Sequence, residues 1–137
     1  MFTFLRLTTV IGLMLLSFGS QALSVIVHPS NTAVLTKSDI ADIFLGKKLE
    51  FENGETIKPV SLGEENEVTL NFVDSVLNKT PAQLKSYWAR LIFTGQGEPP
   101  VAVDSEQQLL EMVASDPNAI GFVSDKSPGG VKVVAEF

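Results

Sequence analysis

Residues 36–48 have the sequence TKSDIADIFLGKK, which predicts a short helix with a defined start and a defined end. Thr36 and Asp39, three residues apart, form a capping-box pattern whose side chains satisfy the first free backbone N–H groups of a helix. One face of this helix is apolar and consists of Ile40, Ile43 and Phe44. Gly46 can adopt the left-handed conformation that commonly ends a helix, so we expect the helix to end there.

Similar patterns predict further helices and strands along the rest of the chain. The predicted helices cover residues 66–77, 80–92 and 105–113. The predicted strands cover residues 24–28, 57–62, 120–123 and 131–137. Pro59 restricts the second strand to a sheet edge or to the first residues of the strand, because proline lacks an N–H group. The alternation predicts an α/β fold with a mostly parallel central sheet, flanked by about four helices.

The segment DIFLGKK at residues 42–48 resembles part of the periplasmic phosphate-binding proteins of ABC transporters, which belong to the type 2 solute-binding family. Three later stretches resemble the same family in the same order: WARLIFTG at 88–95, PPVAVDSEQQLLEM at 99–112 and PNAIGFV at 117–123. The resemblance implies a periplasmic-binding-protein-like domain. Full-length members have two lobes that close on an anion, whereas this chain has the length of one. We therefore expect a single-lobe member.

The first 22 residues have the pattern of a secretory signal peptide. Arg6 precedes an apolar run, and Ser20 and Ala22 are small residues suited to a signal-peptidase site. We expect cleavage after Ala22, a periplasmic location for a single domain of residues 23–137, and no direct membrane insertion of that domain. The alternative is an uncleaved N-terminal anchor. The sequence contains no cysteine, so a lipoprotein anchor and disulfides are both excluded.

Composition excludes several classes of function. Without Arg6, nine Lys and Arg face sixteen Asp and Glu, a net charge of −7 that opposes binding to nucleic acid or anionic membranes. With no cysteine and one histidine, His28, a zinc site would lack its usual ligands. No phosphate-binding loop, dinucleotide fingerprint or nucleophile-elbow motif is present. We expect a protein without enzymatic activity, metal or cofactor, in which His28 is structural.

The resemblance implies an anion site that this chain only partly retains. In the family, an arginine and a Gly-Ser-Gly-Thr-like turn precede a helix with a Phe near its start. Phe72 can stand for that Phe, but Ser61 lies near the arginine position and the turn carries three carboxylates: Glu64, Glu65 and Glu67. A helix N-terminus has about half a positive charge, so three full negative charges should repel phosphate. These carboxylates either complement the helix dipole or bind a cation or basic ligand.

Two polar groups remain as candidate ligand-binding residues. The first group follows the first strand: Ser30, Asn31 and Thr32. The second surrounds the start of the second helix: Ser61, Gly63, Asn66 and Thr69. Ligands of open α/β sheets bind at the carboxyl ends of the strands, so we expect both groups at that edge.

The leading hypothesis is a secreted, non-enzymatic module that binds a small anion or a protein partner in the periplasm, with a membrane transporter or sensor as its downstream partner. One alternative is genuine phosphate binding for ABC-type uptake, with two copies replacing the missing lobe. Another is a small hydrolase that uses acidic residues. If the partner is a protein, the edge that corresponds to the ligand cleft should be an exposed apolar patch.

Overall fold

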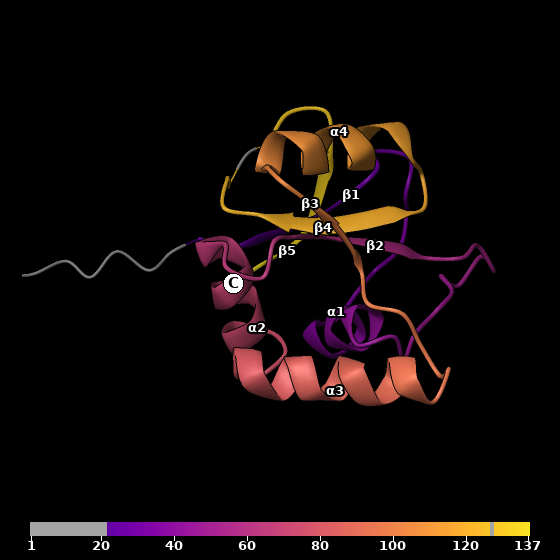
Figure 1. The fold of residues 1–137 in the computed structure, drawn as a ribbon. Coiled ribbons are helices and arrows are strands. Elements are labelled where there is room, and N and C mark those ends of the chain that lie inside the picture. Colours follow the sequence, from indigo (N-terminus) through magenta and orange to yellow (C-terminus); the bar gives the residue numbers. More distant parts are fainter. Residues whose placement is uncertain (1–21, 127) are drawn as a thin grey trace, which may run out of the picture.

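The computed structural model describes residues 22–126 and 128–137 of the 137-residue chain. Apart from Ala22, the predicted signal peptide lies outside the described residues, so its cleavage stays a prediction. The elements in chain order are β1 (Ser24–Val27), α1 (Lys37–Phe44), β2 (Lys58–Leu62), α2 (Glu67–Ser75), α3 (Pro81–Phe93), β3 (Val101–Val103), α4 (Glu106–Ser115), β4 (Ala119–Val123) and β5 (Lys132–Glu136) (Figure 1). The described part of the chain contains no helix that is long and apolar enough to cross a membrane.

The strands form one open sheet in the order β3-β2-β4-β1-β5. β2 pairs in parallel with β3 and β4, whereas β1 pairs antiparallel with β4 and β5. Four strands therefore run in one direction and β1 runs in the other. The predicted α/β fold is confirmed, but the sheet is mixed because β1 opposes both its neighbours. The sequence of β1, SVIV, is buried along its whole length and carries no signal of direction.

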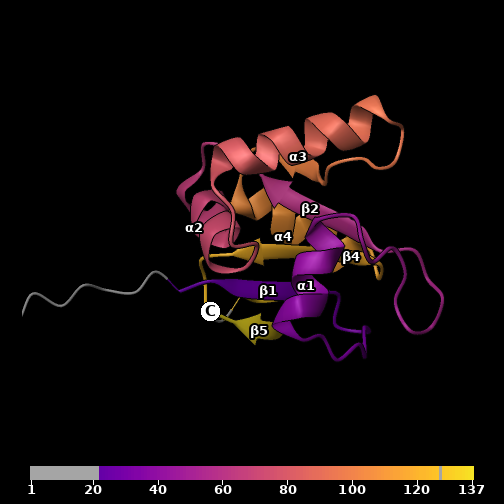
Figure 2. The ribbon, with the colours of Figure 1, turned by 90° about the horizontal axis from the view of Figure 1, so that it is seen from below.

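The helices cover both faces of the sheet. α4 lies on one face, and α1, α2 and α3 lie on the other, with α3 as the outermost layer (Figure 1). Seen from that second face, α1 lies over β1, while α3 is displaced toward β2 (Figure 2). The molecule therefore has a layer of one helix, a sheet layer, and a thicker layer of three helices.

α1 has the caps that its sequence predicts. The Thr36 Oγ1 accepts a hydrogen bond from the Asp39 backbone N–H at 3.1 Å, and the Asp39 carboxylate accepts one from the Thr36 N–H at 2.9 Å. Gly46, just after the helix, has a φ of +71° in the left-handed region. The helix begins and ends where these residues require it to, so this prediction is confirmed.

A cluster of three aromatic rings joins α1, α2 and β4 in the core. Phe72 stacks on Phe122 with ring centroids 4.2 Å apart, and Phe44 packs edge-on against Phe72 at 4.7 Å and against Phe122 at 5.7 Å. All three are almost fully buried. Phe72 is therefore a core residue in this chain.

Strand β3 was not predicted from the sequence, because it is only three residues long and follows directly after Pro99 and Pro100. It pairs with β2 from Val60 onward, whereas the pairing of β2 with β4 involves Lys58 and Pro59. At Pro59 the strand therefore has a partner on one side only. This agrees with the expectation that proline, which cannot donate a hydrogen bond, is confined to an edge position.

Candidate functional site

Three parallel strands end at the same edge of the sheet, the edge at which ligands of open α/β folds bind. We call the residues that follow β2, β3 and β4 there, residues 63–67, 104–106 and 124–126, the acidic edge. It carries one positive side chain, Lys126, and six carboxylates: Glu64, Glu65, Glu67, Asp104, Glu106 and Asp125. The electrostatic environment of this edge opposes an anion.

At this edge, the start of α2 is capped by the side chain of its N-cap residue, Asn66. The Asn66 Oδ1 accepts a hydrogen bond from the Val68 backbone N–H at 2.9 Å, which occupies one of the free donors of the helix N-terminus. The hydroxyl of Ser61 donates a hydrogen bond to the Leu62 carbonyl oxygen at 2.8 Å. One N–H group at the start of α2 and the hydroxyl of Ser61 are therefore engaged locally and are not free to bind an anion.

Glu106, in the first turn of α4, closes the end of β4. One oxygen of its carboxylate accepts a hydrogen bond from the Ser124 backbone N–H, and the other accepts one from the Ser124 hydroxyl at 3.0 Å. Sequence reasoning missed this contact because the two residues lie 18 positions apart and neither belongs to a recognisable motif. The contact occupies another N–H group of the acidic edge, this time with a carboxylate oxygen.

The residues that follow β1 lie at the opposite edge, so the expectation that both candidate groups share one edge was wrong. Val27 pairs with Ile120 and Lys58 pairs with Ala119, so β1 ends where β2 and β4 begin. There Ser30, Asn31 and Thr32 line a hollow of about 360 Å³, together with Phe51, Asn53, Glu55, Pro117 and Asn118. Because β1 is antiparallel to its neighbours, the two groups cannot form one site.

The polar atoms of this hollow mainly stabilise its own turns. Asn31 accepts from the Ala33 backbone N–H through its side chain at 2.8 Å, and its carbonyl oxygen accepts from the Lys132 Nζ at 3.1 Å. His28 Nδ1 accepts from the Ser30 backbone N–H at 3.1 Å. His28 therefore takes part in the turn after β1, as a structural histidine would.

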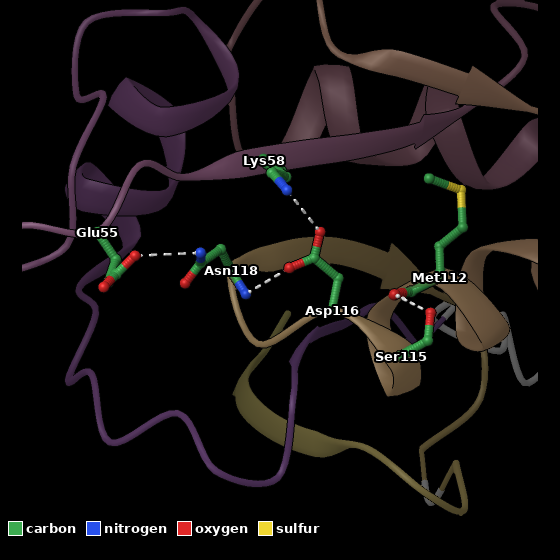
Figure 3. A network of polar contacts seen from close by, with 6 residues as sticks. All are labelled: Glu55, Lys58, Met112, Ser115, Asp116 and Asn118. Atoms are coloured by element: carbon green, nitrogen blue, oxygen red, sulfur yellow. Dashed lines mark hydrogen bonds and ion pairs between the residues drawn. The ribbon is translucent and has the colours of Figure 1, made fainter.

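A polar network beside this hollow ties the segment before β2 to the turn before β4 (Figure 3). Asp116 accepts from the Asn118 backbone N–H at 2.9 Å and forms an ion pair with Lys58 at 3.1 Å. The Asn118 side chain reaches Glu55 at 3.4 Å. The hydrogen bond from Asn118, together with Lys58, holds the pKa of Asp116 below its ordinary value of 3.8. The network joins segments far apart in the chain and requires no ligand.

The acidic edge itself, residues 63–67, 104–106 and 124–126, contains no large apolar side chain, so the apolar patch expected there for a protein partner is not found, which argues against a protein partner at that edge. Exposed apolar side chains occur instead around α3, β3 and the segment after α1, and include Ile92, Phe93, Val101, Met112 and Leu49. Within the described residues, no group of three or more His, Asp or Glu side chains is placed to hold a metal ion.

The structure is similar to solved receptors of phosphate transport. A phosphate transport receptor from Vibrio cholerae has a TM-score of 0.60 at 17% identity, over 82% of this chain and 45% of the receptor. A protein assigned as a phosphate ABC transporter substrate-binding protein, with bound phosphate, from Clostridium perfringens has 0.63 at 21%, over 82% and 44%. PstS from Borrelia burgdorferi has 0.58 at 19%, over 74% and 40%. Neither a protein-family model nor a curated protein sequence matches the chain.

The chain thus spans less than half the length of these receptors. At these identities the likeness shows the fold, and it agrees with the predicted single lobe. The described residues fold like one part of a phosphate-transport receptor, a periplasmic-binding-protein-like α/β fold.

Proposed function

We propose that this protein is a non-enzymatic binding module of the periplasm, with the fold of a receptor lobe, that does not bind phosphate. The observation that supports this proposal is the charge of the turn before α2. Glu64, Glu65 and Glu67 stand where a phosphate receptor would present donors to its anion. The fold supports a binding role, and the negative charge of the acidic edge opposes binding of the anion that the solved neighbours are named for.

The sizes of the opposing charges at the acidic edge favour exclusion of phosphate. A helix N-terminus offers about half a positive charge, and salt screens charges over a Debye length of about 8 Å at physiological ionic strength. Five of the six carboxylates of the acidic edge lie in the turns at the N-termini of α2 and α4, so salt screens their repulsion of an anion bound there only weakly. The hydrogen bonds that Asn66 accepts from Val68 and Glu106 accepts from Ser124 add a second barrier, because an anion would have to displace them.

Titration calorimetry with inorganic phosphate tests this proposal. We expect no saturable heat from residues 23–137 at neutral pH. The matched variant carries Glu64→Gln, Glu65→Gln and Glu67→Gln, which keep side-chain size and remove the charges. Weak binding heat that appears only in this variant would show that the three carboxylates prevent the wild-type protein from binding phosphate.

Saturable heat with a micromolar Kd from the wild-type protein would overturn the proposal. It would favour a true phosphate receptor that delivers its anion to an ABC transporter. In either case, the names of the solved neighbours support a membrane transporter as the partner. A membrane sensor is the alternative partner.

A further inference from the structure

The helix α3 and the turn before it carry positive charge only. Residues 75–97 include Lys79, Lys85 and Arg90 and contain no Asp or Glu, although residues 23–137 contain sixteen. Of the four described helices, α3 is the one with a net positive charge, and it forms the outermost layer of the molecule (Figure 1). An acidic protein therefore presents one basic helix at its surface.

Two of these cations border an open hollow of about 540 Å³ beside α3. Its lining includes Asn78, Lys79, Gln83, Ser86, Tyr87 and Arg90. Both charged residues of the lining are positive, and the amide and hydroxyl side chains beside them can donate hydrogen bonds. The hollow therefore attracts anionic groups.

Tyr87 positions the two cations beside this hollow. The Lys79 Nζ lies 5.4 Å and the Arg90 Cζ 5.9 Å from the centroid of the Tyr87 ring, within the range of a cation–π interaction. The Tyr87 hydroxyl donates a hydrogen bond to the carbonyl oxygen of Leu45, which anchors the ring to the end of α1. Neither cation forms an ion pair with a carboxylate of the described residues. Both cations are thus positioned in advance and available to an anionic partner.

Phe93 extends this surface with an exposed aromatic ring. It is 92% exposed and follows Arg90 by three residues, so the two side chains are neighbours on the surface of α3. Aromatic side chains and Arg are enriched in protein interfaces, where they contribute much of the binding energy. The combination of cations with an exposed Phe indicates a protein partner that offers both carboxylates and an apolar contact.

An anionic membrane fits this surface less well. Recognition of anionic lipids usually takes a cluster of about four to eight Lys and Arg residues, and residues 75–97 contain three. A bilayer is also an extended surface, so it would meet the carboxylates of the rest of the protein. A short acidic segment can contact the cations of α3 alone.

We propose that this basic surface docks an acidic segment of a protein partner. We define the basic surface by six residues: Lys79, Gln83, Ser86, Tyr87, Arg90 and Phe93. Carboxylates of the partner pair with Lys79 and Arg90, and an apolar side chain next to them covers Phe93. The surface goes beyond the proposed function and does not depend on it, because it lies outside the acidic edge and holds whether or not phosphate binds there.

Selection from short random peptides displayed on phage tests this surface without a known partner. We expect the peptides enriched on the immobilised protein to be rich in Asp and Glu and to carry an apolar residue. The most enriched peptide, synthesised with a fluorescent label, should then bind the protein saturably in solution, as measured by fluorescence anisotropy. Added salt should weaken this binding, because it screens exposed charges.

Three variants locate the binding of the labelled peptide. Lys79→Gln combined with Arg90→Gln removes both cations and should weaken binding by about tenfold or more. Lys37→Gln combined with Lys126→Gln is the matched control, since it removes the same charge at exposed positions outside the hollow, and it should leave the affinity unchanged. Phe93→Ala should weaken binding by about three- to tenfold. Circular dichroism of each variant confirms that it is folded.

No enrichment of acidic peptides, or an affinity that the Lys79 and Arg90 double variant leaves unchanged, would overturn the surface. Unaltered affinity in Phe93→Ala would overturn the apolar contact. Two competing occupants are tested with the same double variant. Cosedimentation with phosphatidylglycerol vesicles that it abolishes would assign the surface to anionic lipid, and self-association in sedimentation velocity that it abolishes would assign the surface to a second copy of the chain. Either result would contradict the proposed protein partner.

Discussion

A Cβ atom on Gly121 would lie 2.5 Å from the Cδ2 atom of Leu109. Gly121 is in the middle of β4, and Leu109 is one of two fully buried residues of α4, the other being Val113. Real Cβ atoms do not approach another heavy atom so closely, so α4 reaches its observed position only because residue 121 has no side chain. The close packing of α4, the single helix on that face of the sheet, therefore depends on a glycine at position 121.

Gly121→Ala should therefore destabilise the protein. Leu109 has to change its rotamer or α4 has to move, and such overpacking costs about 1 to 3 kcal/mol. Urea unfolding of both proteins measures the difference. Gly129→Ala is the matched control, because a Cβ at Gly129 meets nothing within 4 Å, and its midpoint should stay near that of the wild type. Equal midpoints for both variants would show that α4 packs less closely than described.

Thr69→Val should stabilise the protein. The substitution keeps the shape of the side chain and removes a buried hydroxyl without a partner, whose burial costs about 1 to 3 kcal/mol. Thr36→Val makes the same chemical change at the N-cap of α1, where the hydroxyl accepts from Asp39, and should cost about 1 kcal/mol. Thermal unfolding should thus show changes of opposite sign. A loss of stability in both would mean that Thr69 has a partner.

Trp88→Ala should destabilise the protein by about 3 to 5 kcal/mol, the usual cost of removing a buried aromatic side chain. Trp88 is 8% exposed and packs against the turn after α1, where a Cβ on Gly46 would lie 3.2 Å from its ring. Phe93→Ala, on the same helix but at a side chain that is 92% exposed, should change the urea midpoint little. Similar small effects in the two variants would show that α3 contributes little to stability.

Stability should fall in acid partly through Asp116. The hydrogen bond from the Asn118 backbone and the ion pair with Lys58 hold its folded-state pKa below the ordinary value of 3.8. A lowered pKa stabilises the folded state above the ordinary value, and this stabilisation is lost as the pH falls through the folded-state pKa. Asp116→Asn should lower the urea midpoint at pH 6, and the gap to the wild type should close below pH 3.8. A gap that stays constant with pH would contradict this assignment.

The local elements could be predicted because their signals lie within a few residues of each other. The capping boxes of Thr36 with Asp39 and of Thr80 with Gln83 set the starts of α1 and α3, and both are present in the structure. Strand direction has no such local signal. β1 is buried on both faces, and an apolar run packs equally well in either direction, so its antiparallel pairing could not be anticipated.

The reversed direction of β1 also limited how well the candidate site could be predicted. Asn66 and Thr69 belong to the edge where β2 ends, and Asn31 lies at the opposite edge because β1 is reversed. Contacts such as Glu106 with Ser124 join residues that only the completed sheet brings together. The charges of the turn before α2 could be predicted from the sequence alone, because they depend on neighbouring residues in one turn.

The most direct measurement is a titration of isotope-labelled protein with inorganic phosphate, followed by the backbone amide resonances of Glu67, Val68 and Thr69 at the start of α2. A parallel titration with chloride at the same ionic strength controls for salt. The account predicts that phosphate and chloride shift these resonances equally and without saturation. Saturable shifts of these three amides with phosphate alone would contradict it.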